Sequence, residues 1–350
     1  MAIKVLHLPS YHPAVSKIFE SNKIEIVNPN TDLFNELKQL PFEKFINKCI
    51  PQAYDLVHIH FEYYTVQILK FEKLLKYFKK NKKPIVWTWH DKKSLLDESA
   101  KSTHEKLLFK YADKIITPTN GMKLWIMGNF GFHSNDIEVI PLGFMTHPKV
   151  IKKLMKKSRK DKKLFTMLIG DFRNSKEYIQ SVINFLDSTE LNDAKLQVIF
   201  RPINIYTQRY KKIKQELITF HQITQNPRVS VICKVSFSDA DIAELFYMSH
   251  AVILPYIWGD HSGQIELARD CGCHAIVSDV GFYKEQNNEI WEYKTSDQQF
   301  DKYPERYVQE LINAYNSPSL SPDIDRRLSE HKQYLHQHYS VYKNLISHEN

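Results

Sequence analysis

Two apolar runs with one helix-length segment between them constrain this chain more than any other feature of its sequence. Residues 251–254 and 275–277 are continuously apolar, as strands are when helices cover both faces of their sheet. The segment that joins them has room for one helix, which begins near Ser262 and Gly263. A strand, a helix and a strand over this length favour two parallel strands with a right-handed crossover. We therefore predict a parallel α/β sheet here.

Similar apolar runs recur along both halves of the chain. The other predicted strands are residues 3–8, 56–60, 84–88, 114–117 and 137–140 in the first half, and residues 164–169, 196–200 and 229–233 in the second. Segments with helical periodicity separate them, such as residues 65–79 and a segment that Thr119 can cap. Strands and helices that alternate at this interval predict two doubly wound α/β domains.

The domain boundaries follow from one basic segment. With 350 residues and 43% hydrophobic content, the chain can bury two cores. Residues 149–163, KVIKKLMKKSRKDKK, are dominated by lysine and arginine, and we place a linker there, between domains of residues 1–148 and 164–322. A solvated helix or hinge explains these cations more simply than a membrane or nucleic-acid contact. Residues 323–350 carry a stripe of tyrosines and leucines, which predicts a helix that crosses back to the first domain.

Charge and cysteine content indicate which partners and which cellular compartment to expect. The formal net charge is +8, which favours acidic partners such as a nucleotide sugar, an anionic membrane or polymer, or nucleic acid. No apolar run is long enough to span a membrane, and no signal peptide is recognisable. The four cysteines show no metal-ligand pattern. We expect reduced thiols in a cytoplasmic protein, either in solution or peripheral to a membrane.

Two groups of residues that suit phosphate follow predicted strands in the second half. Gly170 ends one strand, and Arg173 and Lys176 follow it; arginine can bind two phosphate oxygens and lysine adds a mobile charge. Ser262 can simply cap its helix, but Gly263 also lets a ligand approach the free helix amides, which suit a phosphate. Because the carboxyl ends of parallel strands meet at one edge of a sheet, we expect a single diphosphate site.

Five segments, in one order, resemble those of a known family. In the first half, DLVHIHFEYY resembles D-V-V-H-x-H-W, IVWTWHD resembles I-V-W-T-x-H-N, and VIPLGF resembles V-I-P-H/N-G. In the second half, GDFRNSK resembles G-x-x-R-P-Y-K-G. The longest segment, LPYIWGDHSGQIELARDCGCHAIVSDVG, resembles L-P-Y-x(4 or 5)-S-G-x-x-x-L-A-x-x-x-G-x-P-V-V-x-x-D-x-G. These motifs belong to one branch of the retaining group-1 glycosyltransferases. The resemblance covers most of the chain from Asp55 to Gln286. It implies the GT-B fold, in which two Rossmann-like domains face a central cleft.

The same resemblance implies an activity. The chain would be a retaining, metal-independent glycosyltransferase of the hexosyltransferase type, active in carbohydrate biosynthesis. Its second domain would bind a nucleotide diphosphate sugar, first of all a UDP-sugar, and its first domain a hydroxyl acceptor that is a glycan, a lipid-linked sugar or a small molecule. No further cofactor is implied. The acceptor hydroxyl would attack from the leaving-group face and pass its proton to the departing phosphate oxygen, so that no dedicated base is required.

Roles for single residues also follow from the resemblance. Arg173 and Lys176 would neutralise the donor diphosphate as the leaving group gains charge, Glu285 would face the sugar or ribose hydroxyls, and His90 would lie beside the transferred sugar. The other donor-binding residues would be Gly170, Ser262, Gly263 and Glu266, with Cys233 and Val235 near the nucleotide base. The acceptor-side residues would be Tyr11, His12, His60 and Asp91, the last of which stands where the family usually has asparagine.

Three histidines of the first half allow two interpretations. His58 and His60 are two residues apart on one predicted strand, so their side chains share a face. Together with His90 they are a candidate metal triad. No carboxylate stands near them at a ligand spacing, and we therefore expect that they line or underlie the cleft without a metal. A histidine whose nitrogens bond only to the backbone is the alternative for His90.

The donor loop departs from the family pattern. The family has two glutamates separated by seven residues; aligned on Gly272, this chain has Gly259 and Leu267 there, with Glu266 one residue away. This departure suggests one alternative function, a catalytically degenerate subunit that binds a nucleotide sugar or a carbohydrate without turnover.

A second alternative is a DNA-modifying glucosyltransferase, an activity that also uses the GT-B fold and that the positive charge would suit. Against it, the basic segment lacks the interleaved aromatic residues of a stacking platform.

Overall fold

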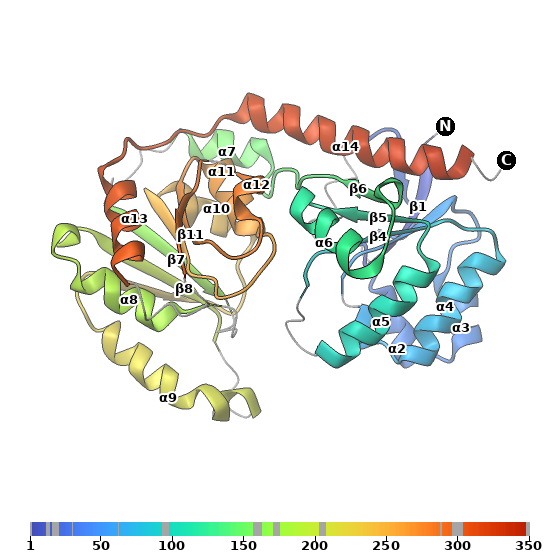
Figure 1. Ribbon diagram of the computed structural model, residues 1–350, viewed down its shortest axis with the longest axis horizontal. Helices are drawn as coiled ribbons and strands as arrows, with labels where there is room; N and C mark the ends of the chain where they lie inside the picture. Colours follow the sequence, from blue (N-terminus) through green and yellow to red (C-terminus); the bar gives the residue numbers. More distant parts are fainter. Residues whose placement is uncertain are drawn as a thin grey trace. The chain divides into compact units, whose positions relative to one another are not determined.

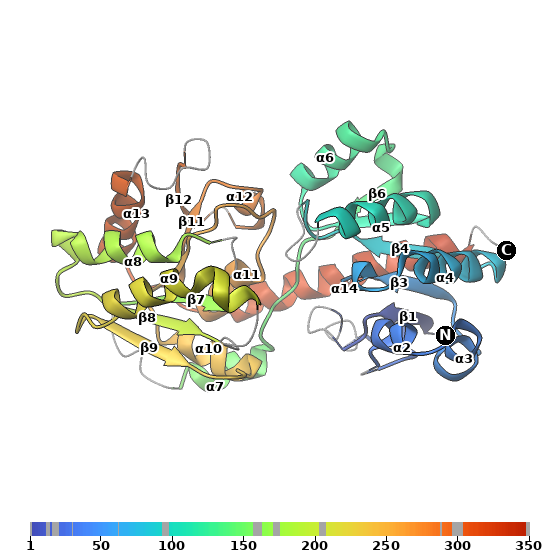
Figure 2. The same ribbon diagram turned by 90° about the horizontal axis from the view of Figure 1, so that it is seen from below.

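The computed structural model describes residues 2–11, 15, 21–29, 31–61, 63–92, 98–156, 163–170, 176–202, 208–287, 289–295 and 304–347, with the side chains of 98–100 and 208–213 excepted. Two compact units make up the chain: Met1–Gly143 with Ser329–Asn350, and Phe144–Leu328. Each unit contains a six-stranded sheet with helices between the strands (Figures 1 and 2). The predicted α/β fold class is confirmed.

The sheet of the first unit has the strand order β2-β1-β3-β4-β5-β6, with every pair parallel. Its strands are β1 (Ile3–Leu8), β2 (Ile24–Ile26), β3 (Leu56–Ile59), β4 (Ile85–Thr88), β5 (Lys114–Thr117) and β6 (Ile137–Val139). Five of them agree with the predicted runs to within one residue at each end. In this register His7 of β1 lies opposite His58 of β3.

The helices of the first unit follow its strands in sequence. They are α2 (Leu33–Gln39), α3 (Phe42–Cys49), α4 (Ile68–Lys80), α5 (Glu98–Tyr111) and α6 (Asn120–Phe130), with the short 3-10 turns η2 (Tyr63–Thr65) and η3 (Ser134–Asp136). The predicted cap of α6 is confirmed, because the Thr119 hydroxyl accepts a hydrogen bond from the Met122 amide at 3.3 Å. Gly131 ends this helix in the left-handed conformation, with φ at 71°, which glycine adopts without strain.

The last helix, α14 (Ile324–Ser347), belongs to the first unit from Ser329 onward. Its buried side chains Tyr334, Val341 and Tyr342 pack with strand residues such as Val5 and Leu56 in one hydrophobic core. The tyrosines and leucines of the predicted stripe therefore cover one face of the first sheet. Burying such large apolar surfaces is what holds the end of the chain on this unit.

The sheet of the second unit has the order β12-β11-β10-β7-β8-β9, again with parallel pairs. Its strands are β7 (Leu164–Gly170), β8 (Lys195–Phe200), β9 (Val229–Cys233), β10 (Ala251–Leu254), β11 (His274–Ser278) and β12 (Trp291–Tyr293). Alternate residues enter two separate cores: Ile253 packs on one face of β10, and Val252 and Leu254 pack on the other. The predicted parallel pair of β10 and β11 is confirmed.

Helices cover both faces of this second sheet. One core takes side chains from α8 (Tyr178–Asp187), α9 (Gln208–Ile223) and α13 (Pro304–Asn316), and the other from α7 (Pro148–Leu154), α10 (Asp239–Tyr247) and α11 (Gly263–Cys271). The short elements η4 (Thr189–Leu191) and α12 (Tyr283–Gln286) complete the unit. Coverage on both faces explains why its central strands are continuously apolar.

The passage between the units differs from the predicted linker of residues 149–163. The second unit already begins at Phe144, and α7 occupies the first half of the basic segment. Ile151 and Leu154 of α7 are buried in the core, whereas Lys152 and Lys153 are exposed. The basic run is therefore in part the solvated face of an amphipathic helix, whose apolar residues stand three apart among lysines. Residues 157–162 lie outside the described part of the chain.

The described residues bear on two expectations from the sequence, the absence of a membrane-spanning segment and the reduced state of the cysteines. None of their helices is long and apolar enough to cross a membrane. The four cysteines are all free thiols, of which Cys271 and Cys273 are buried and Cys233 is exposed.

Candidate functional site

The carboxyl edge of the second sheet brings together the loops that follow β7, β10 and β11. These three strands are neighbours in the sheet. Helix α11 follows β10, and α12 follows β11 (Figure 1). Lys176, Ser262, Gly263 and Glu285, predicted from separate segments, all belong to this edge. Arg173 lies outside the described residues, so its predicted role stays a prediction.

Ser262 and Gly263 form the start of α11. The Ser262 hydroxyl accepts a hydrogen bond from the Gln264 amide at 3.2 Å and lies 2.9 Å from the Tyr256 hydroxyl. The Ser262 amide is occupied, because it donates to the side-chain oxygen of Gln286 at 2.7 Å. Within the described part of the chain, the Gly263 amide has no hydrogen-bond partner. A free amide at the positive end of a helix dipole is suited to an anion.

Lys176 lies beside this helix start. Its side chain is largely buried, with 9% of the residue exposed, and its ammonium donates to the Leu168 carbonyl at 2.6 Å and reaches Gln264 Oε1 at 3.5 Å. The ammonium also lies 4.7 Å from the centre of the Tyr256 ring. Tyr256 thus contacts both the cation and the Ser262 hydroxyl, and it holds the two parts of the candidate anion site together.

Gln286 is a site residue that the sequence reasoning missed. The family pattern pointed to Glu285, whose side chain is exposed on α12. Gln286 instead bonds both backbone groups of Ser262: its amide oxygen accepts from the Ser262 N–H, and its amide nitrogen donates to the Ser262 carbonyl at 3.3 Å. Only a side chain that both donates and accepts can do this. The amide side chain of Gln286, next to Glu285, was the feature of the sequence that could have indicated this role.

Glycine is required where the loops after β10 and β11 touch. Gly281 has φ at 68°, and a Cβ there would lie 2.1 Å from the Gly259 carbonyl oxygen and 2.8 Å from Asp260 Cα. Any other residue would collide with backbone. The Phe282 amide then donates to the Asp260 carbonyl at 3.0 Å. This close approach sets the position of α12 and hence of its glutamine.

Glu266, predicted to bind the donor, lies inside the unit. Only 2% of it is exposed, and its carboxylate contacts Arg269 Nη1 at 3.0 Å and Arg327 Nη2 at 2.9 Å, while Gln286 donates to it at 3.3 Å. Burial raises the pKa of Glu266, and the two guanidinium groups oppose that shift. Of its three side-chain partners, Gln286 links Glu266 to the Ser262 backbone, so Glu266 helps to position the start of α11. Its predicted contact with the donor stays a prediction.

Asp270 extends this buried network to the two ends of the unit. Its carboxylate accepts from the amides of Met145 and Thr146 at 2.6 and 2.9 Å and from Arg327 Nε at 2.7 Å. Burial raises the pKa of Asp270 against the opposing effect of Arg327. The residues at which the second unit begins and ends are thus tied to α11, the helix whose start forms the candidate anion site.

The other predicted donor residues line the same edge at a distance from Lys176. Gly170 ends β7 with φ at 72°. Cys233 ends β9, and Val235 follows it with 79% of its surface exposed. Because β9 is two strands from β7 and neighbouring strands lie about 4.8 Å apart, roughly 10 Å separates the ends of these strands.

In the first unit, histidines gather at the carboxyl ends of β1, β3 and β4. His7 Nδ1 and His60 Nε2 are 2.9 Å apart. His58 Nδ1 lies 2.6 Å from the Tyr342 hydroxyl, and His58 Nε2 lies 2.7 Å from the Thr88 hydroxyl. Burial lowers the pKa of His58 and His60 well below the ordinary value and that of His7 to about 3. These imidazoles are therefore neutral at physiological pH.

His90, the histidine predicted to lie beside the sugar, is half-buried after β4. Its ring stacks on Phe61, with ring centres 4.0 Å apart and planes inclined by 25°. The carbonyl of its neighbour Asp91 accepts a hydrogen bond from Lys101. Tyr11 is 40% exposed, and His12 lies outside the described residues. His60 and His90 thus lie just beyond the ends of the neighbouring strands β3 and β4, at the same edge of the sheet.

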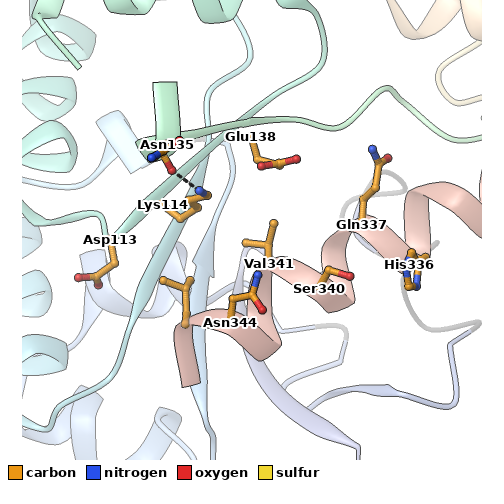
Figure 3. Close-up of a pocket in the computed structure, with 10 residues that line it drawn as sticks. Asp113, Lys114, Asn135, Glu138, His336, Gln337, Ser340, Val341 and Asn344 are labelled. Carbon is orange, nitrogen blue, oxygen red and sulfur yellow. Dashed lines mark hydrogen bonds between the residues drawn. The ribbon is translucent and has the colours of Figure 1, made fainter. Parts of the chain in front are cut away.

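A cavity of about 520 Å³ lies elsewhere in the first unit. Figure 3 shows its lining, which comes from α14 and from the amino-terminal ends of β5 and β6. Eight of its ten lining residues have polar side chains, among them Glu138, Gln337 and Asn344, and the Lys114 ammonium donates to the Asn135 carbonyl. No residue predicted for the site lines this cavity, which is at the amino edge of the sheet, whereas His7, His58 and His60 lie toward the carboxyl edge.

Comparisons with known proteins concern the family and the fold of the chain. Residues 6–147 match the family Glycosyltransferase Family 4. A search of curated sequences found no significant match. Among solved structures, a UDP-forming alpha,alpha-trehalose-phosphate synthase from Burkholderia xenovorans, in complex with glucose-6-phosphate, is 12% identical, with a TM-score of 0.59 over 96% of this chain and 81% of that chain.

Two further structures match almost end to end. A glycosyltransferase from Rickettsia africae is 12% identical, with a TM-score of 0.57 and 99% of each chain covered. HepE from Anabaena, in complex with UDP, is 13% identical, with a TM-score of 0.57 over 97% of this chain and 100% of that chain. At these identities the likeness shows the fold. The chain therefore has the GT-B fold, and residues 6–147 match a glycosyltransferase family model, in line with the resemblance seen in the motifs.

Proposed function

We propose that the protein is a retaining glycosyltransferase that moves a hexose from a nucleotide diphosphate sugar to a hydroxyl acceptor, without a catalytic metal ion. The family and the similar folds support glycosyl transfer in general. Two of the similar structures suggest a UDP-sugar as donor: one synthase is described as UDP-forming, and HepE is in complex with UDP. The first of these also contains glucose-6-phosphate, which favours a sugar or sugar phosphate as acceptor.

The observation that carries the proposal is the meeting of Lys176 with the start of α11. The largely buried Lys176 ammonium lies over the Tyr256 ring, and the Tyr256 hydroxyl is within hydrogen-bond distance of the Ser262 hydroxyl, next to the Gly263 amide. A cation and a helix start at the carboxyl edge of a parallel sheet suit a diphosphate. The exposed end of β9, about 10 Å away by strand spacing, is a suitable place for the base of the same nucleotide.

In the proposed reaction the bond between the anomeric carbon and the β-phosphate oxygen breaks, and a bond from that carbon to the acceptor oxygen forms on the same face. The acceptor proton passes to the departing phosphate oxygen. Lys176, and Arg173 by prediction, would stabilise the negative charge that grows on the leaving group. His90 would orient the transferred sugar through a hydroxyl hydrogen bond, because a neutral imidazole can donate and accept.

Thermal stabilisation by nucleotides tests the proposal. UDP, UDP-glucose, UDP-galactose, UDP-N-acetylglucosamine and GDP-mannose are screened, each with a parallel assay for released nucleotide. A donor at 100 times its dissociation constant adds about 2.7 kcal/mol of stability, which is roughly 5 to 10 °C in Tm for a domain of this size. Lys176→Ala should weaken binding at least about tenfold, as the loss of a charged hydrogen bond does.

Lys195→Ala is the matched control, because Lys195 is an exposed lysine at the start of β8, on the amino edge of the same sheet. It should bind nucleotide as the unmodified chain does. If no nucleotide raises the Tm, or if both variants respond equally, the proposed site is wrong.

A binding subunit without turnover is the second candidate. It is favoured by the burial of Glu266, whose carboxylate is engaged by Arg269, Arg327 and Gln286 rather than directed to a ligand. In that case the nucleotide sugar would stabilise the protein, and no nucleotide would be released with any acceptor of a broad panel of sugars and sugar phosphates.

A further inference from the structure

We propose that His7, His58 and His60 form a binding site for one divalent transition-metal ion, with Zn²⁺ as the best-suited ion. The site belongs to the first unit and has a structural role. It does not depend on the proposed transfer reaction, which needs no catalytic metal. The sequence alone had suggested His58, His60 and His90 as a triad and favoured no metal; the structure brings His7 to the first two instead.

The strand register creates this cluster. His7 and His58 are direct partners in the parallel pair of β1 and β3, and His60 stands two residues further on the same face. The ring centres of His58 and His60 are 3.8 Å apart, and that of His7 lies 5.2 Å from each. One nitrogen from each ring lies within 4.8 Å of the other two.

These separations are close to those of a bound ion. Three imidazole nitrogens at about 2.1 Å from a tetrahedral Zn²⁺ are about 3.4 Å apart. In the structure one nitrogen from each ring lies within 4.8 Å of the other two, and His7 Nδ1 and His60 Nε2 are 2.9 Å apart. Shifts of no more than about 1.5 Å in any pair would therefore form the site, which is within the reach of side-chain rotation on neighbouring strands.

The type of side chain in the cluster also suits a metal. Neutral imidazole is the form that binds metal, and it prefers zinc, copper and nickel to calcium or magnesium. Among the described residues His7 Nε2 is buried without a hydrogen-bond partner, which is unusual for a polar atom in a core.

The surroundings supply outer hydrogen bonds. His58 has a hydroxyl at each nitrogen, from Tyr342 of α14 and from Thr88 of β4. An ion bound to one nitrogen would replace that hydroxyl contact, and the other nitrogen would then donate to the remaining hydroxyl, as metal-bound histidines usually do. An ion here would join β1 and β3 and, through Tyr342, the last helix. With three neutral ligands, a fourth position is open to hydroxide or chloride, which would offset part of the charge.

Cobalt titration of the full chain tests the site. Protein stripped with a chelator is titrated with Co²⁺, whose visible bands report four-coordinate binding, and Zn²⁺ is then added. We expect one Co²⁺ per chain, displaced by Zn²⁺, and a rise in Tm with Zn²⁺. His7→Gln and His60→Gln should weaken binding at least about 100-fold, since even outer-shell changes cost 10- to 100-fold.

His104→Gln is the matched control, because His104 is a buried histidine of the same unit that bonds the Val66 carbonyl; it should leave Co²⁺ affinity unchanged. Should the cluster variants fail to fold, X-ray absorption of the zinc-loaded, unmodified chain decides, with three imidazole donors expected. Folded protein that takes up no Co²⁺, unchanged affinity in His7→Gln, or a zinc spectrum with fewer than three imidazoles would overturn the proposal.

Discussion

Replacing Arg327 with methionine tests the buried network beneath the candidate site. The substitution keeps an aliphatic stem and removes the guanidinium that joins Glu266 and Asp270. Arg327 lies 2.9 Å from the first carboxylate and 2.7 Å from the second, and all three residues are at most 4% exposed. In the variant Glu266 keeps Arg269, whereas Asp270 keeps only backbone amides as partners among the contacts described above.

The cost can be estimated from these distances. At an effective dielectric constant of about 20, each contact is worth roughly 6 kcal/mol of Coulomb attraction, most of which offsets the desolvation of the charges. Removing one partner leaves buried charge uncompensated, and we expect a loss of about 3–5 kcal/mol in the free energy of unfolding of the second unit at pH 8.

The loss should depend on pH. Burial already raises the pKa of both carboxyl groups, and removing the guanidinium raises these pKa values further. A carboxyl group whose folded pKa exceeds its unfolded value lowers stability above the folded pKa, and this effect disappears as the pH falls to the unfolded value. The difference between Arg327→Met and the unmodified chain should therefore be smaller at pH 5 than at pH 8.

Urea denaturation, followed by tryptophan fluorescence and by hydrogen exchange at the Met145 and Thr146 amides, measures the effect. Arg326→Met is the matched control, because that side chain is 48% exposed and pairs with Glu289 at 3.4 Å; it should change stability by no more than about 0.5 kcal/mol. Equal losses in the two variants, or a loss for Arg327→Met below about 0.5 kcal/mol, would refute the reasoning.

Three further substitutions have defined outcomes. Gly281→Ala should lower the Tm and abolish nucleotide stabilisation, since its Cβ would overlap the Gly259 carbonyl in a left-handed backbone; normal UDP binding would contradict this. Gly128→Ala, in α6 with no atom from outside its own stretch of helix backbone within 4 Å of the new Cβ, should stabilise the first unit by up to about 1 kcal/mol in urea titrations. Ser262→Ala removes the cap on the Gln264 amide and should cost about 1 kcal/mol by the same measurement.

Continuous apolar runs made most strands of both sheets predictable, because the central strands are buried on both sides. The three-residue strand β2 (Ile24–Ile26) and the edge strand β12 (Trp291–Tyr293) were not predicted, since runs this short carry no distinct periodicity. In the segment of residues 149–163, the lysines hid the spacing of Ile151 and Leu154. The lysine and arginine content of this segment led to its interpretation as a linker, whereas the spacing of its apolar residues would have indicated helix α7.

The site was less predictable than the fold, because its contacts join distant segments. Ser262 and Lys176 could be anticipated as neighbours from the rule that parallel strands end at one edge. His7 could not be assigned to His58, because the pairing depends on the register of β1 against β3, across about 50 residues of sequence. Gln286 was passed over for Glu285, since the orientation of the short helix α12 decides which of them meets the Ser262 backbone.

The central claim is that the start of α11 binds the diphosphate of the donor, and glycine amides report on it directly. The chain has nine glycines, so a sample labelled with ¹⁵N-glycine gives a spectrum with few signals. On titration with UDP, the signal of Gly263 should shift strongly, while those of Gly128 and Gly131 of the first unit stay in place. A Gly263 signal that is unmoved at saturating UDP would contradict the account.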